Sequence, residues 1–255
     1  MINEKIQKVL ANAGLGSRRH IENWLREGRI SVNGKVAKLG DRITETAKVK
    51  VDGREIKLIK SQTQRIRVLL YHKPEGEICS RSDPEKRPTV FDKLPLLRNG
   101  RWIAIGRLDF NTSGVLLFTN SGKLANQLMH PSANIEREYA VRIQGQVTPA
   151  MLKKLKKEIK LKDGPARFES INDAGGEGTN HWYHVIVKEG RNRVVRRLWE
   201  SQGVKVSRLI RIRFDSIPLP RLLARGKWRE LTTKEMHQLI KENGRVDPHE
   251  KACFK

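Results

Sequence analysis

Apolar residues in the first sixty positions recur at intervals of three and four, which is the spacing of one face of a helix. The segment EKIQKVLANAGLG, residues 4–16, has this pattern and closes on glycines. RRHIENWLREG repeats the pattern directly after Ser17, a residue type that often caps helices. RISVNGKVAK then alternates on both sides of Asn33-Gly34, a strong signal for a hairpin turn. The region therefore predicts two helices followed by a hairpin.

Beyond residue 66, strand-like and helix-like stretches take turns along the chain. The stretches that read as strands are residues 66–74, 114–122, 137–145, 181–190 and 206–214. Helical spacing occurs in residues 123–131, 148–159 and 191–203, and Thr148-Pro149 is a typical helix start. This alternation predicts an α+β fold with a mixed α/β core.

The two patterns suggest two domains with a boundary near residue 60. We expect an N-terminal domain over residues 1–60, a polar and basic linker over 61–66, and a larger domain over 67–242. Residues 243–255 have no periodic pattern, and we expect them to form a flexible tail.

Charge narrows the class of partner. The chain has 52 Lys and Arg against 28 Asp and Glu, a formal net charge of +24, which favours a polyanion such as nucleic acid. No apolar run approaches the roughly twenty residues that span a bilayer, so we expect no membrane partner. The N-terminus has no signal-like apolar core, and the two cysteines, Cys79 and Cys253, form no Cys-x-x-Cys. We therefore expect a cytoplasmic protein without disulfides.

Several motifs that carry cofactor chemistry are missing from the sequence. There is no GxxxxGK[ST] phosphate loop, no glycine-rich dinucleotide fingerprint after a strand, no HExxH and no Cys/His cluster. A metal-dependent nuclease would need several converging acids, and acids are scarce in this chain. We therefore expect neither a cofactor nor a metal site.

Among the acidic residues, Asp109 stands out by its position in the sequence. It lies in GRLDFNTSG, residues 106–114, between an arginine and a predicted turn, directly before the apolar run VLLF. One interpretation is that its carboxylate only accepts hydrogen bonds from the backbone of residues 111–113, as Asp does in many turns. The other is that the turn holds a reactive carboxylate at the edge of a cleft. Position alone favours the first interpretation.

The N-terminal region resembles the S4 RNA-binding domain. The order helix, helix, hairpin, the Ser-Arg-Arg that opens the second helix, and GRISVNGKV carry the resemblance over about residues 3–50. It implies that basic side chains contact RNA, and we expect these to be Arg18, Arg19, Arg29 and Lys35. The alternative is a solvated basic face on a small structural module.

The remainder is similar to RNA pseudouridine synthases of the RsuA/RluB group. The similar stretches are HKPEG, RPTVFDKLP, GRLDFNTSGVLLFTNSGKLANQLMHP, REYAV and EGRNRVVRRL, between Val68 and about Leu231. The resemblance implies a largely antiparallel sheet flanked by helices, and an isomerase that converts uridine to pseudouridine without a cofactor. It also implies that the target nucleotide is flipped out of the RNA, which costs a few kcal/mol of stacking.

The resemblance assigns three catalytic residues. Asp109 matches the essential aspartate, which attacks the nucleoside or abstracts a sugar proton. Tyr139 matches the tyrosine that stacks on the target base, although a tyrosine in a strand is also a common core residue. Arg196 matches the arginine that forms an ion pair with the aspartate, and the alternative is an arginine that faces phosphate.

Further positions are expected to shape the site or to contact RNA. They are Lys73, Arg87, Arg107, Arg191, Arg193 and Arg197, and the polar loop Cys79–Pro95 is expected to touch the substrate stem. Lys73, in the first motif, is expected to help shape the floor of the site. Val194 stands where the family usually has a polar residue, and His130 and His184 are given no role.

The expected partner is large-subunit (23S) ribosomal RNA. GEGTNHWY, RIRFDSIPLP and GKWREL favour the members of the group that act on the large subunit. Two alternatives remain, a small-subunit enzyme of the same group and a non-catalytic RNA chaperone or ribosome-assembly factor. We expect a monomer, because an enzyme that docks on a large RNA needs no second copy.

Overall fold

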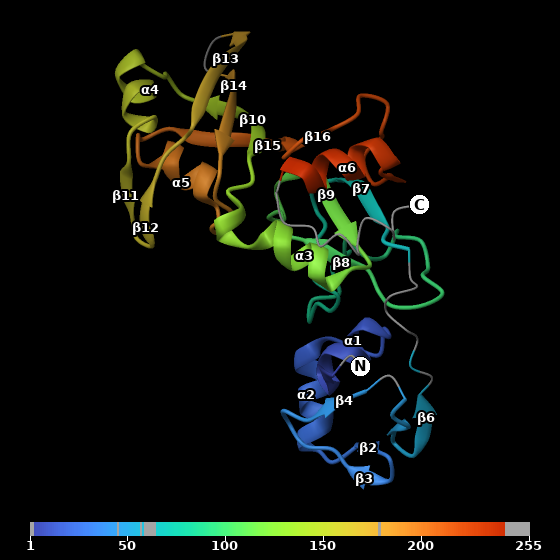
Figure 1. The fold of residues 1–255 in the computed structure, drawn as a ribbon. Helices are drawn as coiled ribbons and strands as arrows, with labels where there is room; N and C mark the ends of the chain where they lie inside the picture. The colour runs from blue at the N-terminus through green and yellow to red at the C-terminus, as the bar shows by residue number, and fades with distance from the viewer. Residues whose placement is uncertain (1–2, 45, 57, 59–64, 178–179, 243–255) are drawn as a thin grey trace.

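The computed structural model describes residues 3–44, 46–56, 58, 65–177 and 180–242. The predicted tail over 243–255 and most of the predicted linker over 61–66 lie outside the described residues. In Figure 1 the N-terminal unit is the blue part of the chain, and the larger C-terminal unit runs from cyan at β7 to red at α6.

The N-terminal unit contains the predicted helices and hairpin. Its elements are β1 (Glu4–Lys5), α1 (Ile6–Asn12), α2 (Arg18–Arg26), β2 (Ile30–Val32), β3 (Lys35–Val36), β4 (Arg42–Ile43), β5 (Val49–Val51) and β6 (Arg54–Ile56). The Ser17 side chain accepts a hydrogen bond from the backbone N–H of His20 at 3.0 Å, which confirms the predicted cap. Asn33 and Gly34 both have positive φ, 50° and 84°, as a two-residue hairpin turn between β2 and β3 requires. Ile6, Leu10, Ile21 and Leu25 are buried in a core beside the sheet β3-β2-β5-β6.

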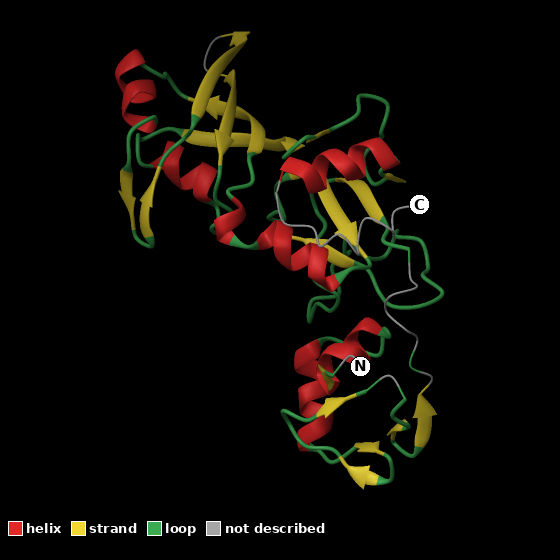
Figure 2. Cartoon of the chain, in the orientation of Figure 1, coloured by secondary structure: helices red, strands yellow, loops and turns green. Residues whose placement is uncertain are grey.

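The C-terminal unit is built on one nine-stranded sheet, which confirms the α+β expectation (Figure 2). Its strand order is β13 (Ser170–Glu177), β14 (Asn180–Val187), β10 (Arg137–Gln144), β15 (Lys205–Phe214), β9 (Ser113–Thr119), β7 (Val68–Lys73) and β17 (Trp228–Glu230). In addition, β8 (Ile103–Ile105) pairs with β9, and β16 (Ile217–Pro218) pairs with β15. Every pair in the sheet is antiparallel except β9 with β15. The expected largely antiparallel sheet is therefore present.

Helices cover the sheet and close two cores. The helices are α3 (Gly122–Met129), α4 (Pro149–Leu155), α5 (Val194–Glu200) and α6 (Thr233–Glu242), with a 3₁₀ turn at Pro131–Ala133 and a small hairpin, β11 (Ile159–Leu161) and β12 (Gly164–Ala166). One core packs α3 and α6 against one face of β7 and β9, as Figure 1 also shows. The other core packs Trp199 of α5 against Phe168 and Tyr183. The apolar run before Asn120 forms β9, whose residues are all buried.

The parallel pair β9–β15 joins the two halves of the sheet. Only Ile210 with Ser113 and Arg211 with Gly114 are in register there. Gly114 has a φ of +110°, and a Cβ built on it would lie 2.2 Å from the carbonyl oxygen of Arg211. The two backbones therefore come close enough only because residue 114 has no side chain. This junction brings the turn that precedes β9 next to β10 and β15.

Several local features differ from the sequence prediction. The helix expected over 148–159 ends at Leu155, and Ile159 begins strand β11. The helix expected over 191–203 begins at Val194, because Arg193 has a left-handed backbone (φ 49°) and lies outside the first turn. Helix α6 was not predicted. Its signal is a capping box: Thr232 N–H donates to the Glu235 carboxylate, and Glu235 N–H donates to the Thr232 hydroxyl.

Candidate active site

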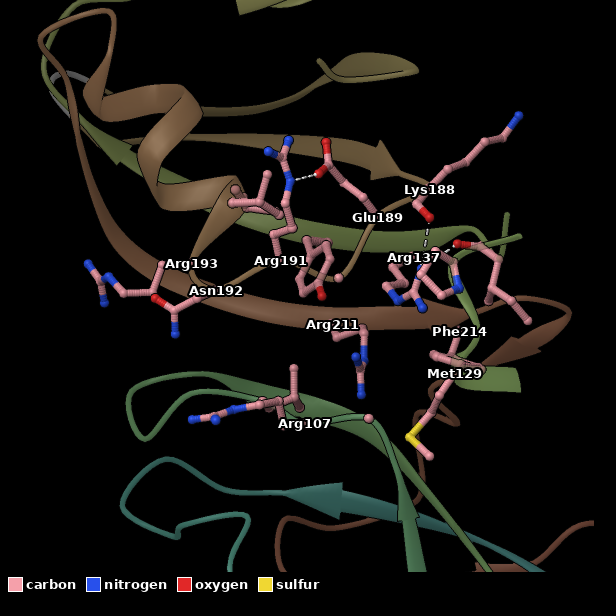
Figure 3. Close-up of a pocket in the computed structure, with 18 of the residues that line it drawn as sticks. Arg107, Met129, Arg137, Lys188, Glu189, Arg191, Asn192, Arg193, Arg211 and Phe214 are labelled. Carbon is pink, nitrogen blue, oxygen red and sulfur yellow. Dashed lines mark hydrogen bonds and ion pairs between the residues drawn. The ribbon is translucent and has the colours of Figure 1, made fainter. Parts of the chain in front are cut away.

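A pocket of about 810 Å³ opens between the turn that precedes β9 and the strands β10 and β15. Asp109 enters it from the turn, Tyr139 from β10 and Arg211 from β15, while residues 188–195 form another wall. Figure 3 shows the basic side chains that surround this space. Asp109 and Tyr139, which are thirty residues apart in sequence, therefore line one cavity, as the sequence analysis expected.

The Asp109 turn is fixed through its backbone. The Thr112 N–H donates to the Asp109 carbonyl oxygen at 3.0 Å, and the Gly76 N–H donates to the Phe110 carbonyl oxygen at 3.0 Å. The half-buried Asp109 carboxylate itself forms no hydrogen bond or ion pair within the part of the chain that the structure describes. The interpretation of Asp109 as a simple turn cap is therefore wrong, because its carboxylate binds none of the backbone N–H groups of residues 111–113.

Lys73 is the cation beneath this turn. Its side chain is fully buried, and its ammonium donates to the carbonyl oxygens of Pro74 at 2.9 Å, Asp109 at 3.1 Å and Thr112 at 2.9 Å. Burial lowers the pKa of Lys73, and nearby acidic groups, Asp109 among them, oppose that shift. Lys73 thus holds the floor of the site from inside, which makes direct contact with RNA impossible in this conformation.

Arg196 holds the same turn from the α5 side, but not as predicted. Its Nη2 donates to the Asn111 carbonyl oxygen at 2.9 Å and its Nη1 to the Val206 carbonyl oxygen at 2.8 Å. No ion pair with Asp109 is found among the described residues, because both terminal nitrogens are directed to backbone oxygens. Burial, followed by repulsion from Arg193, lowers the pKa of Arg196, whereas the charge of Asp109 raises it. Asp109 therefore acts on the charge of Arg196, but no hydrogen bond or ion pair joins the two side chains among the described residues.

Tyr139 lies on β10 beside Arg211 of β15, its partner in the antiparallel register. The ring is only 8 % exposed, so it is part of the core, and it also lines the pocket. The core interpretation of this tyrosine is therefore confirmed, and its place in the pocket wall leaves the expected stacking on the target base as a prediction.

The arginines of the segment 189–197 differ in their partners and in whether they line the pocket. Arg191 pairs with Glu189 and with Asp163 of the β11–β12 turn, and Arg197 binds the same Asp163 through two hydrogen bonds of 2.7 and 3.0 Å. Arg197 is absent from the pocket wall, whereas Arg191, Arg193 and Arg107 line it. Arg197 therefore anchors the small hairpin to α5.

The remaining predicted RNA contacts lie outside the pocket. Arg18, Arg19 and Lys35 are exposed and form no ion pair within the described ranges. Arg29 instead binds Asp52 through hydrogen bonds of 2.8 and 2.6 Å, and it also reaches Glu27.

Arg87, in the loop Cys79–Pro95, is paired in the same way. It binds Asp83 through hydrogen bonds of 2.9 and 2.8 Å, and this pairing lowers the pKa of Asp83 to about 2. Its guanidinium carbon lies 5.9 Å from the ring centre of Phe110, next to the Asp109 turn. The loop therefore reaches the edge of the site.

Sequence reasoning missed several pocket residues. Arg137, Arg211, Phe214, Met129 and Lys188 all line the cavity. Arg137 could have been found, because it is two residues before Tyr139 on one strand, where side chains i and i+2 share a face. His130 also lines the pocket, and its ring accepts a hydrogen bond from the Ser132 N–H.

The described residues offer neither a metal-binding cluster nor a membrane-spanning helix. No group of three or more His, Cys, Asp or Glu side chains is placed to hold a metal ion there. Among the helices that the structure describes, none has the length and apolar character needed to cross a bilayer.

Comparison with known proteins gives consistent results for both units. Residues 67–201 match the RNA pseudouridylate synthase family, and residues 4–49 match the S4 domain. The chain is 59 % identical over 240 residues to ribosomal large subunit pseudouridine synthase B of Escherichia coli (strain K12), covering 93 % of this chain and 82 % of that protein. It is 59 % identical over 238 residues to the protein of the same name from Pasteurella multocida, and the alignment covers 92 % of this chain and 69 % of that protein.

A solved structure described as pseudouridylate synthase has the same fold. It aligns with a TM-score of 0.65 at 22 % identity, over 92 % of this chain and 99 % of that one.

Proposed function

Since this chain belongs to the RNA pseudouridylate synthase family and carries an S4 domain, we propose that it isomerises a uridine of large-subunit (23S) ribosomal RNA. The names of its relatives in Escherichia coli and Pasteurella multocida support the large subunit as the source of the substrate. It acts in the cytoplasm as a monomer during ribosome biogenesis, with residues 1–60 and 67–242 as its two domains.

The reaction balances without a second reactant. The bond between N1 of uracil and C1′ of ribose breaks, the base rotates, and a bond between C5 and C1′ forms. The hydrogen on C5 leaves as a proton, and N1 takes up a proton. Nothing is oxidised or reduced, so the residues of the pocket can supply all of the acid–base chemistry.

Asp109 is the reactive group of this site, and its free carboxylate is the observation that carries the proposal. A carboxylate without a protein partner is available to react with the sugar or to take a proton from it. The turn around it is immobilised by Lys73 and by Arg196, each of which binds its carbonyl oxygens. Such fixation of a reacting group in one geometry is a major source of rate enhancement.

Tyr139 and Arg196 complete the site in different ways. Tyr139 offers a ring to the flipped uracil, against which the base stacks. Arg196 is a positioning residue, because it holds the Asn111 carbonyl oxygen and contributes positive charge behind the turn. Arg107 at the pocket wall binds an RNA phosphate directly, and Arg18, Arg19 and Lys35 extend that surface onto the S4 domain. Arg191 and Arg193 contact phosphate only when they give up their ion pairs with Glu189 and Glu200.

The test is release of tritium from ribosomal RNA that carries uridine tritiated at C5. Formation of the C5–C1′ bond expels this hydrogen, so release reports the chemistry directly. Wild type and Asp109→Asn are compared on unmodified RNA of each subunit, together with RNA binding by both proteins. We expect release by wild type from large-subunit RNA and at least a 10³-fold loss in Asp109→Asn, with binding retained.

Each other outcome contradicts a defined part of the proposal. Release from small-subunit RNA alone would show that the substrate is the other subunit. Binding without release on RNA of both subunits would leave the chaperone interpretation. Equal release by wild type and Asp109→Asn would remove Asp109 from the chemistry.

A further inference from the structure

Arg211 is a buried arginine to which neither the sequence analysis nor the catalytic scheme gives a role. It is 2 % exposed, and it lines the pocket beside Tyr139. Its Nε donates to the Val115 carbonyl oxygen at 2.7 Å, which fixes the direction of the guanidinium. Its Nη2 is buried and has no hydrogen-bond partner among the described residues. A buried donor without a partner is costly in a folded protein, so a functional reason is expected.

A second guanidinium, that of Arg137, contacts the same aromatic ring as Arg211. The guanidinium carbons of Arg137 and Arg211 are each 5.4 Å from the ring centre of Phe214. Arg137 donates only to backbone carbonyl oxygens, those of Ile135 at 2.7 Å and Lys188 at 3.1 Å. Burial and the nearby charge of Arg211 both lower the pKa of Arg137. The guanidinium groups of Arg137 and Arg211 therefore repel one another in the wall of the pocket, where both contact Phe214.

Nearby acids offset the charge of this pair only in part, because Asp215 and Glu189 raise the pKa of Arg137 less than burial lowers it. Only Asp109 and Glu189 line the cavity, against six arginines and lysines. Glu189 is occupied by Arg191, and Asp109 makes no ion pair in the part of the chain described. In Figure 3 the Arg211 side chain points from β15 into the pocket, toward the segment that carries Arg107.

We propose that Arg211, together with Arg137, forms an anion subsite that binds a phosphate group of the flipped target nucleotide. A phosphate oxygen takes the free Nη2 donor of Arg211 and offsets the repulsion between the two guanidinium groups. The subsite holds the nucleotide by its backbone while Tyr139 contacts the base and Asp109 meets the sugar. This inference rests on the proposed function, since it needs a flipped nucleotide as ligand.

The experiment removes the charge from each partner in turn. The probe is a short synthetic RNA that wild type modifies, with one linkage next to the target uridine replaced by a neutral methylphosphonate, on the 5′ or the 3′ side. The control, called the unaltered RNA below, keeps the ordinary phosphodiester at that position. The 2′-hydroxyl next to the linkage is removed in both RNAs, because it would otherwise cleave the neutral linkage. KM and kcat are measured for wild type, Arg211→Gln, Arg211→Lys and Arg208→Gln.

We expect one of the two neutral linkages to raise KM of wild type about tenfold, as loss of a charge-assisted hydrogen bond does. Arg211→Gln should raise KM about tenfold on the unaltered RNA and be insensitive to the neutral linkage. Arg211→Lys should keep part of the sensitivity. Arg208→Gln, which removes an exposed arginine from the same strand, should keep the wild-type ratio between the two RNAs.

The ratio between the two RNAs separates this role from a structural one, since a folding defect lowers activity on both RNAs equally. If the neutral linkages raise KM of wild type and of Arg211→Gln by the same factor, the phosphate assignment is overturned. A rise in KM of Arg211→Gln that is the same on both RNAs would then point to a uracil oxygen as the partner of Arg211. If wild type releases no tritium from any ribosomal RNA, the proposed function fails. If wild type is active and both Arg211 variants have the same KM and kcat as wild type, only this inference is rejected.

Discussion

At the scale of single residues, the site leaves the Asp109 carboxylate without a partner among the described residues and binds the backbone around it instead. Lys73 and Arg196 place two positive charges behind the Asp109 turn, yet both direct their donors to carbonyl oxygens. An ion pair would have occupied the carboxylate oxygens that the proposed reaction requires. Holding the main chain fixes the position of the carboxylate and leaves those oxygens available.

Lys73 should therefore control both activity and stability. Lys73→Met keeps a similar shape but leaves buried carbonyl oxygens without a donor, which costs about 1–3 kcal/mol of unfolding free energy. We expect kcat to fall at least tenfold because the Asp109 turn loosens, with a smaller change in KM. Tritium release and urea unfolding measure the two effects. Lys153→Met, the same change at an exposed position of α4, should alter stability by less than about 0.5 kcal/mol.

At the scale of elements, the junction between β9 and β15 sets the geometry of the pocket. The Asp109 turn precedes β9, and Arg211 lies on β15 opposite Gly114. Tyr139 lies on β10, directly beside β15. A shift at this junction would therefore change the distance between the carboxylate and the two side chains of the opposite wall.

Gly114→Ala tests this junction. Its Cβ would overlap the Arg211 carbonyl oxygen at 2.2 Å, and the φ of +110° is strained for any side chain. We expect a loss of at least about 2 kcal/mol of stability, together with reduced kcat. Gly203→Ala is the matched control, because Gly203 also has positive φ, +79°, but open space around it. Equal destabilisation of the two variants in urea unfolding would mean that close approach of the strands is unimportant.

At the scale of the whole molecule, the net charge of +24 includes many arginines that are already paired. Arg29, Arg87 and Arg197 each bind an aspartate through two hydrogen bonds. Arg18 and Arg19, by contrast, are exposed and form no ion pair with any described residue, so they remain available to a polyanion. The number of basic residues therefore overstates the surface that can bind RNA.

This difference predicts the salt dependence of binding. RNA affinity should fall steeply with salt, because each phosphate contact releases a counterion. Replacing both Arg18 and Arg19 by Gln should weaken binding and reduce the slope of log K against log salt by about one to two. Arg29→Gln should change the slope by less than half as much, since that guanidinium is neutralised by Asp52. Filter binding across a salt series measures these slopes, and similar slopes for the two variants would contradict the argument.

Much of the fold could be predicted from local signals. The Ser17 cap, the Asn33-Gly34 turn and the Thr148-Pro149 helix start are interactions within a few residues, and the structure confirms each of them. Helix α6 carried an equally local signal, its capping box, which was overlooked. The left-handed Arg193 that delays the start of α5 had none, because a non-glycine residue with positive φ depends on its surroundings.

The candidate site was predictable only in part. Asp109 and Tyr139 came from motif resemblance, and the structure places both in one pocket. The resemblance also assigned Arg196 to Asp109, but the direction of a guanidinium depends on the oxygens within its reach. Arg211 had no distinguishing sequence feature, since it is one of several arginines in an alternating strand.

The sequence by itself determined the local elements, the two-part organisation, the positive charge and the family to which the chain belongs, because each depends on neighbouring residues, on composition or on motif content. Only the tertiary structure decided which charges are free. It joined β9 to β15 across nearly one hundred residues and paired Arg29 and Arg87 with aspartates. Within the described ranges it left the Asp109 carboxylate and the Arg211 Nη2 without hydrogen-bond partners. Pairing is a matter of distance in space, and distance is fixed only when the chain has folded.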